Sequence, residues 1–125
     1  MANEITAQFT LSYTNTPAGI PQQTIQLPAK TFNISGVNYN GISFTVPTTA
    51  GGTLIPQGGL QSRGFAGFLN VGTSVVEILT AVSGTVIIAM NPGEPALFRF
   101  GSGMTAPAAL AISSPGQLIL LMLEN

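Results

Sequence analysis

The sequence contains no cysteine, histidine, aspartate or tryptophan. Without cysteine the chain forms no disulfide, although this absence does not identify the compartment in which it works. Without His, Asp or Cys, one chain cannot assemble a Ser-His-Asp or Cys-His catalytic set, or a zinc site of the common kind. We therefore predict that the protein is not an enzyme and has no catalytic residue, metal ligand or cofactor-binding residue.

Charge is also scarce, because Asp, Glu, Lys and Arg make up only 6% of the 125 residues, against about 25% in a typical soluble domain. The formal net charge is −1 and the mean hydropathy is +0.45. Either neutral polar side chains solvate the surface, or much of the surface is covered in a permanent assembly. The composition favours the assembly.

Nucleic acid and membrane are poor candidates for the partner. Three basic residues cannot form the cluster that neutralises phosphates. The longest apolar run, Leu118 to Leu123, is far shorter than the roughly 18 residues of a membrane-spanning helix. The first residues show no secretory signal. We therefore expect the partners to be proteins.

Two carboxylates, Glu77 and Glu94, are the only pair that could flank a glycosidic bond. A structural explanation is better supported. Glu94 lies in a predicted turn, where water solvates it, and Glu77 is expected to pair with Arg63 or Arg99 at the surface of a sheet.

Four short apolar runs between residues 63 and 100 are separated by Gly, Pro, Asn and Ser clusters. This pattern predicts consecutive antiparallel strands, which we expect to form a meander at the core of an all-β domain. Pro92-Gly93 predicts a type II turn, because Pro fixes φ at the first central position and Gly accepts positive φ at the second. Pro95 has no N–H for a ladder, so it should begin the next strand or lie on an edge.

The rest of the chain also shows either alternating apolar and polar residues or clusters of turn-forming residues. We expect strands at Glu4–Tyr13 and at Gln23–Leu27, the latter stopped by Pro28, and a β-bulge or bend at Gly36. Asn40-Gly41 predicts a hairpin in which a strand Phe32–Tyr39 pairs with a strand Ile42–Val46. The other expected elements are loops Pro47–Gly59 and Gly101–Pro107, a strand or helical turn at Ala108–Ile112, and a strand Gln117–Leu123. The last strand is apolar on both faces, so both should be covered by protein.

Together these elements predict a single domain over residues 1–125. Its expected fold is an all-β, antiparallel two-sheet sandwich, jelly roll or related barrel of about eight to ten short strands.

Three segments carry a resemblance to a known group of proteins: Gly64-Phe-Ala-Gly-Phe-Leu-Asn-Val-Gly-Thr, Asn91-Pro-Gly-Glu-Pro-Ala-Leu-Phe-Arg-Phe and Leu118-Ile-Leu-Leu-Met-Leu-Glu. They resemble small all-β virion proteins of tailed phages over about the last half of the chain. The alanine-rich loop Met104–Ala111 and the low charge depart from that pattern. The resemblance implies a capsid decoration or cement protein: a homotrimer on the capsid surface of the virion, made in the host cytoplasm, with the major capsid protein and other copies of itself as partners.

The low charge agrees with a cement role, because apolar and neutral polar surface is buried against a shell without desolvating charges. Residues 1–13 form a candidate partner-contacting strand or arm. Aromatic and arginine side chains most often anchor interfaces, and the candidate interface residues are Ile5, Phe9, Arg63, Phe65, Phe68 and Arg99. Phe65 and Phe68 are more often simply core.

A second hypothesis is a host-recognition or glycan-binding module of a phage fibre or tail. In that case the loops Pro47–Gly59 and Gly101–Pro107 would contact the glycan.

Overall fold

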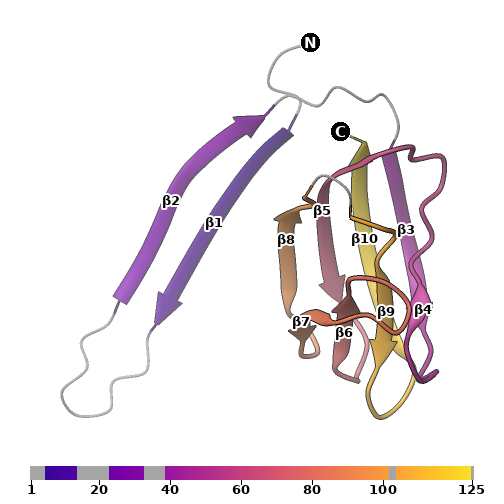
Figure 1. The fold of residues 1–125 in the computed structure, drawn as a ribbon. Coiled ribbons are helices and arrows are strands. Elements are labelled where there is room, and N and C mark those ends of the chain that lie inside the picture. Colours follow the sequence, from indigo (N-terminus) through magenta and orange to yellow (C-terminus); the bar gives the residue numbers. More distant parts are fainter. Residues whose placement is uncertain (1–4, 14–22, 33–38, 102–103, 125) are drawn as a thin grey trace, which may run out of the picture. The chain divides into compact units, whose positions relative to one another are not determined.

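A computed structural model describes residues 5–13, 23–32, 39–101 and 104–124 (Figure 1). These residues contain ten strands and no helix, and all of the strand pairs are antiparallel. The predicted all-β fold with two sheets is confirmed. The contacts within the chain divide it into two compact units, residues 1–34 and residues 35–125. The expectation of one domain over residues 1–125 stays a prediction.

The first unit is a two-stranded sheet of β1 (Ile5–Tyr13) and β2 (Gln23–Phe32). The predicted end of the second strand at Pro28 is wrong, because β2 continues through it. Ala7 is aligned with Lys30 but Phe9 with Leu27, so the register shifts where Pro28 lies. At such a bulge the ladder is already interrupted, and the missing N–H of proline removes no regular hydrogen bond.

The second unit contains two four-stranded sheets, drawn one in front of the other in Figure 1. The first sheet has the order β3 (Tyr39–Val46), β10 (Gly116–Glu124), β5 (Arg63–Asn70), β8 (Pro95–Arg99). The second has the order β4 (Thr53–Leu54), β9 (Ala108–Ala111), β6 (Val76–Leu79), β7 (Val86–Met90).

The core lies between these two sheets. Along β5 and β10 every second residue is buried, as expected for strands with one covered face. The large side chains that are fully buried come from both sheets and from the loop after β4; they include Val46, Ile55, Val76, Ile78, Met90, Leu118, Leu120 and Met122. Among the described residues, no buried side-chain nitrogen or oxygen lacks a hydrogen bond.

The predicted meander is wrong, although all four of its strands form. The chain leaves the first sheet after β5, forms β6 and β7 in the second sheet, and returns as β8 to pair with β5. Backbone hydrogen bonds redirect the chain, since the N–H groups of Val71 and Gly72 both donate to the Gln117 carbonyl, at 2.9 and 3.2 Å. Local sequence pattern favours a strand but does not choose its partner, so it could not distinguish this path from a meander.

The predicted hairpin at Asn40-Gly41 is also wrong, because both residues lie inside the continuous strand β3, which pairs with β10. A type I′ turn needs positive φ at both central residues. Among the described glycines, those with positive φ are Gly51, Gly52, Gly58 and Gly93, and Gly41 is not one of them. The side chain of Asn40 instead donates from Nδ2 to the carbonyl of Pro56 at 2.7 Å. The bulge predicted at Gly36 lies outside the described residues.

The Pro92-Gly93 turn is confirmed, since Gly93 has φ of 83° and the Glu94 N–H donates to the Asn91 carbonyl at 3.0 Å. Pro95 begins β8, an edge strand, as its missing N–H predicts. The segment at Ala108 is a strand rather than a helical turn. The loop expected at residues 47–59 contains the short strand β4.

Candidate protein interface

The residues predicted to form an interface fall in different places. Ile5 and Phe9 lie in β1, and their side chains are outside what the structure describes. Arg63 and Phe65 are half-buried on β5, and Phe65 is aligned with the exposed Arg99 of β8. The structure thus brings these three residues to the same end of the first sheet, and their part in an interface stays a prediction.

Phe68, in contrast, is 3% exposed and belongs to the core, the alternative that its residue type already favoured. Its ring stacks on Phe98 with 5.6 Å between the centroids, and Phe98 meets Phe100 edge to face at 5.0 Å. These geometries are the ones that aromatic pairs prefer. The trio fixes β5 and β8 to each other from the inner side and leaves Phe68 unavailable to a partner.

Arg63 is held at its end of the sheet by polar contacts of its own. Its guanidinium donates to the Gln57 side chain and to the Met104 carbonyl. Glu124, which is 6% exposed, accepts the Gln61 N–H at 2.8 Å. These contacts attach the segment before β5 to the ends of β5 and β10.

The carboxylates Glu77 and Glu94 occupy different settings. Glu94 is exposed in the turn before β8, as predicted, where it accepts the Asn91 backbone N–H at 2.7 Å and the Asn91 side-chain amide. These two hydrogen bonds, the backbone one first, lower the pKa of Glu94 below its usual range. Glu77 lies on β6 of the second sheet, whereas its expected partners Arg63 and Arg99 lie on strands of the first. The expected ion pair at a shared sheet surface is therefore wrong.

The outer face of the first sheet is apolar. The register aligns two rows across the strands β8, β5, β10 and β3 in that order: Leu97, Gly67, Leu121 and Gly41 in one row, and Pro95, Leu69, Ile119 and Ser43 in the next. We use "outer face" for these eight residues. Its four large aliphatic side chains are 37–50% exposed within the described part of the chain.

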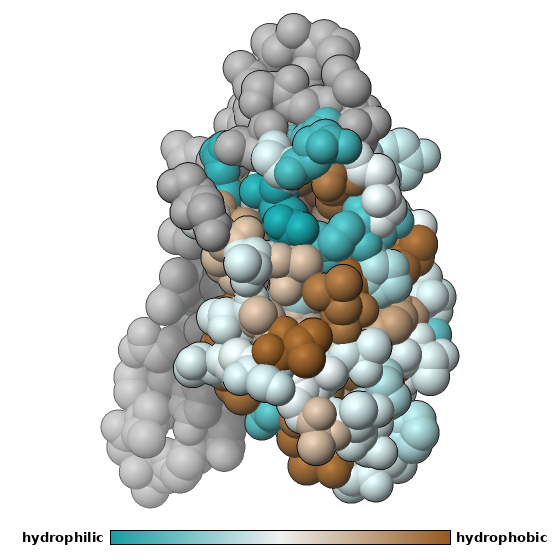
Figure 2. Space-filling model, turned by 45° about the vertical axis from the view of Figure 1, so that its right-hand side comes forward, coloured by the Kyte–Doolittle hydropathy of each residue, from teal (hydrophilic) through white to brown (hydrophobic). Residues whose placement is uncertain are grey.

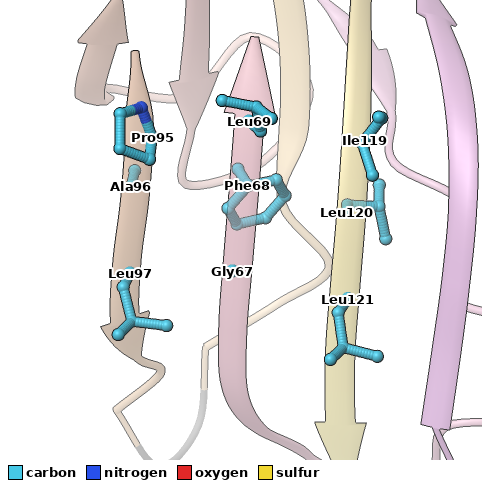
Figure 3. Close-up of a pocket in the computed structure, with 9 residues that line it drawn as sticks. All are labelled: Gly67, Phe68, Leu69, Pro95, Ala96, Leu97, Ile119, Leu120 and Leu121. Carbon is cyan, nitrogen blue, oxygen red and sulfur yellow. The ribbon is translucent and has the colours of Figure 1, made fainter. Parts of the chain in front are cut away.

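Figure 3 shows Leu97, Gly67 and Leu121 at one level of β8, β5 and β10. A shallow apolar groove of about 320 Å³ lies over these strands. Gly67 has no side chain and so leaves room between the two leucines that are its cross-strand neighbours. This groove offers a hollow for an apolar group of a partner.

The sequence pattern did not identify the outer face. Gln117–Leu123 was expected to be covered on both faces, and one face is covered, with Leu118 and Leu120 at most 2% exposed. Ile119 and Leu121, on the other face, are 48% and 47% exposed in the described chain, so coverage of that face by another protein stays a prediction. The continuous apolar run did indicate an apolar outer surface, because a strand that is apolar on both faces requires a layer of protein against each face.

The edge of the second sheet offers another surface. β7 is the last strand of that sheet, it carries no charge and no proline, and Val86 and Ile87 are 43% and 40% exposed. Figure 2 shows the molecule turned by 45° from the view of Figure 1. In that view, apolar residues lie in the middle of the described surface and hydrophilic residues gather towards one end.

Metal-binding clusters and membrane-spanning helices are both absent from the described residues. These residues contain no group of three or more His, Cys, Asp or Glu side chains that could hold a metal ion. They also contain no helix that is long and apolar enough to span a membrane. Comparison of the whole chain with known protein families, curated proteins and solved structures found no match.

Proposed function

We propose that this protein is a structural component of a phage virion, most specifically a capsid decoration or cement protein that stabilises the shell through contacts with the major capsid protein and with its own copies. The low charge and the all-β fold support this proposal, as does the resemblance of the Pro92–Arg99 segment to small phage virion proteins. The observation that carries it is the unprotected edge of β7.

Soluble β-proteins usually protect the edges of their sheets with short strands, proline, charge or covering loops. Two edges of this sandwich follow that rule, and a third has a side-chain contact at one end. β8 begins with Pro95 and ends with Arg99, and β4 has two residues. At the start of β3, the Asn40 side chain is bonded to Pro56 of the loop that follows β4.

β7 has neither proline nor charge in its five residues Val-Ile-Ile-Ala-Met, and Val86 and Ile87 are 43% and 40% exposed in the described part of the chain. A strand of this composition is an aggregation hazard if it stays exposed. It is also a template on which an extended segment of another protein adds as a further strand, through backbone hydrogen bonds and pockets for alternate side chains. We infer that the shell protein supplies such a segment and covers Val86 and Ile87.

The test uses particles assembled without this protein, to which the purified full-length chain is added back. We expect the natural chain to bind and to raise resistance to heat and osmotic shock. Ile87→Lys should reduce binding at least about tenfold, because a lysine on an edge opposes strand addition. The control Val82→Lys changes a residue that is 51% exposed in the turn before β7 and should bind normally.

Particles that are equally stable with and without the protein would refute the cement role. Equal binding by the Ile87→Lys and Val82→Lys variants would refute the use of β7. Binding to a glycan array, with unchanged particle stability, would favour the host-recognition hypothesis and its loops 47–59 and 101–107.

A further inference from the structure

We propose that the outer face of the first sheet binds the same face of a second copy of this chain, in a face-to-face dimer with a twofold axis parallel to the strands. This inference goes beyond the proposed attachment through β7, because it concerns the other sheet and a different partner. It rests on the glycines, on the order of large and small residues, and on the distribution of polar groups.

The glycines at positions 67 and 41 are not explained within the chain. Neither has the positive φ that favours glycine. A Cβ atom added at Gly67 would lie 3.6 Å from Leu97 Cδ1, and one added at Gly41 would lie 3.6 Å from Leu121 Cδ1, both ordinary contact distances. Glycine weakens a strand interior and often marks a close approach by another chain. We infer that both positions are kept small for a partner.

The row that contains these glycines is self-complementary. Across the sheet it alternates large and small: Leu97, Gly67, Leu121, Gly41. A twofold axis midway between β5 and β10 places β5 over β10 of the second copy, and β8 over its β3. Leu121 of each copy then faces Gly67 of the other, and Leu97 faces Gly41. An isologous interface requires a patch of this self-complementary kind.

The neighbouring row agrees with the same axis. Leu69 of one copy faces Ile119 of the other, and Pro95 faces Ser43. Stacked sheets cross at about −30°, so pairs near the axis keep this register best. Those central pairs are Leu121 with Gly67 and Ile119 with Leu69, the ones that contain three of the half-exposed aliphatic side chains.

The polar groups lie around this apolar centre. Thr45 and Gln117 hydrogen-bond to each other at 3.0 Å at one end of the sheet, and the exposed Arg99 and Tyr39 lie at the other. No charged residue occurs in the outer face itself, so a second copy brings no like charge into the centre. An apolar centre with a polar rim is the usual anatomy of an interface between proteins.

The size of the first sheet predicts weak binding. Three strands of eight or nine residues and one of five, at about 4.8 Å spacing and 3.4 Å per residue, cover roughly 500 Å². A stable interface buries about 800 Å² per partner. We therefore expect a reversible dimer with a dissociation constant in the micromolar range. Because an isologous contact pairs two copies, a homotrimer would have to use a different surface.

Sedimentation equilibrium of the full chain, from low to high micromolar concentration, tests the dimer. The matched variants are Ile119→Glu in the outer face and Ile112→Glu outside it, two isoleucines that are 48% and 52% exposed. The first should weaken dimerisation at least about tenfold, because it places two carboxylates beside the axis. The second should leave it unchanged. A monomer at every concentration, or equal effects of the two variants, would overturn the proposal.

A second set of variants tests the geometry and remains informative if Ile119→Glu does not fold. Gly67→Leu and Leu121→Gly should each weaken the dimer, because leucine then meets leucine or glycine meets glycine. The double variant exchanges the two residues without changing composition and should restore binding towards the natural value. If Gly67→Leu alone strengthened association, or the double variant were weaker than both single ones, the self-complementary register would be wrong. If no dimer were found, the proposed attachment through β7 would still stand, because the particle assay tests that attachment separately.

Discussion

Replacing Asn70 should destabilise the protein more than replacing any exposed asparagine, because its side chain joins three segments inside the sandwich. Asn70 is 0% exposed at the end of β5. Its Nδ2 donates to the carbonyls of Ser74 and Met90, at 2.8 and 3.0 Å, and its Oδ1 accepts the N–H of Gly72 at 3.1 Å. These bonds hold the crossing between the sheets and the end of β7.

The magnitude follows from burial. In Asn70→Ala the carbonyls of Ser74 and Met90, both in residues that are 1% exposed, lose their side-chain donor. A buried polar group left unsatisfied costs about 1–3 kcal/mol. Two such groups give a loss of about 4 kcal/mol, a large fraction of the roughly 5–15 kcal/mol by which domains are stable.

The measurement is urea unfolding followed by far-UV circular dichroism, with Asn40→Ala as the matched control. Asn40 also donates to a backbone carbonyl, but its hydrogen bond to Pro56 is exposed. Its loss should cost at most about 1 kcal/mol, since water replaces the partner. If the free energies of unfolding of the two variants fell by the same amount, burial would not be the source of the cost.

Asn70→Asp adds a test with a pH dependence. The carboxyl replaces a donor by an acceptor opposite two carbonyl oxygens, so burial and repulsion should raise the pKa of the new side chain above its unfolded value of about 3.9. The folded state then binds more protons than the unfolded state. Stability should be greatest below about pH 4 and fall as the pH rises towards the raised pKa. A variant that gained stability over that interval would refute the reasoning.

Three further predictions concern turns. Gly93→Ala should cost about 1 kcal/mol through its positive φ, whereas Gly59→Ala, where a Cβ also meets nothing within 4 Å and φ is not positive, should be nearly neutral in urea unfolding. Because the pKa of Glu94 is lowered in the folded state, its contribution to stability is present above the unfolded pKa of about 4.3 and is lost on acidification. Glu94→Gln should therefore reduce the fall in Tm between pH 5 and pH 3, and an unchanged dependence of Tm on pH would contradict this. Gly72→Ala should lower Tm more than Gly93→Ala, because its Cβ would lie 2.6 Å from the Gln117 backbone nitrogen; an equal or smaller loss would be the contrary result.

Short-range features were predictable from the sequence because their causes lie in adjacent residues. The Pro92-Gly93 turn follows from the φ that proline fixes and the φ that glycine permits. The strands follow from alternating or continuous runs of Val, Ile, Leu and Phe, as in β5 and β10. The absence of His, Cys and Asp excludes the usual catalytic sets from composition alone. The strand and turn patterns together determine an all-β chain.

Features that depend on distant residues were decided only by the tertiary structure. β5 and β8 pair directly because Val71 and Gly72 are redirected by Gln117, a residue far along the chain. Asn40-Gly41 remains inside a strand because β10 lies beside it, which overrides a local preference for a turn. The alternation of Leu97, Gly67, Leu121 and Gly41 exists only once four strands are in register. Pairing between strands is a non-local choice, and so the sequence by itself determined the strands while the sheets, and the surfaces they present, came from the fold.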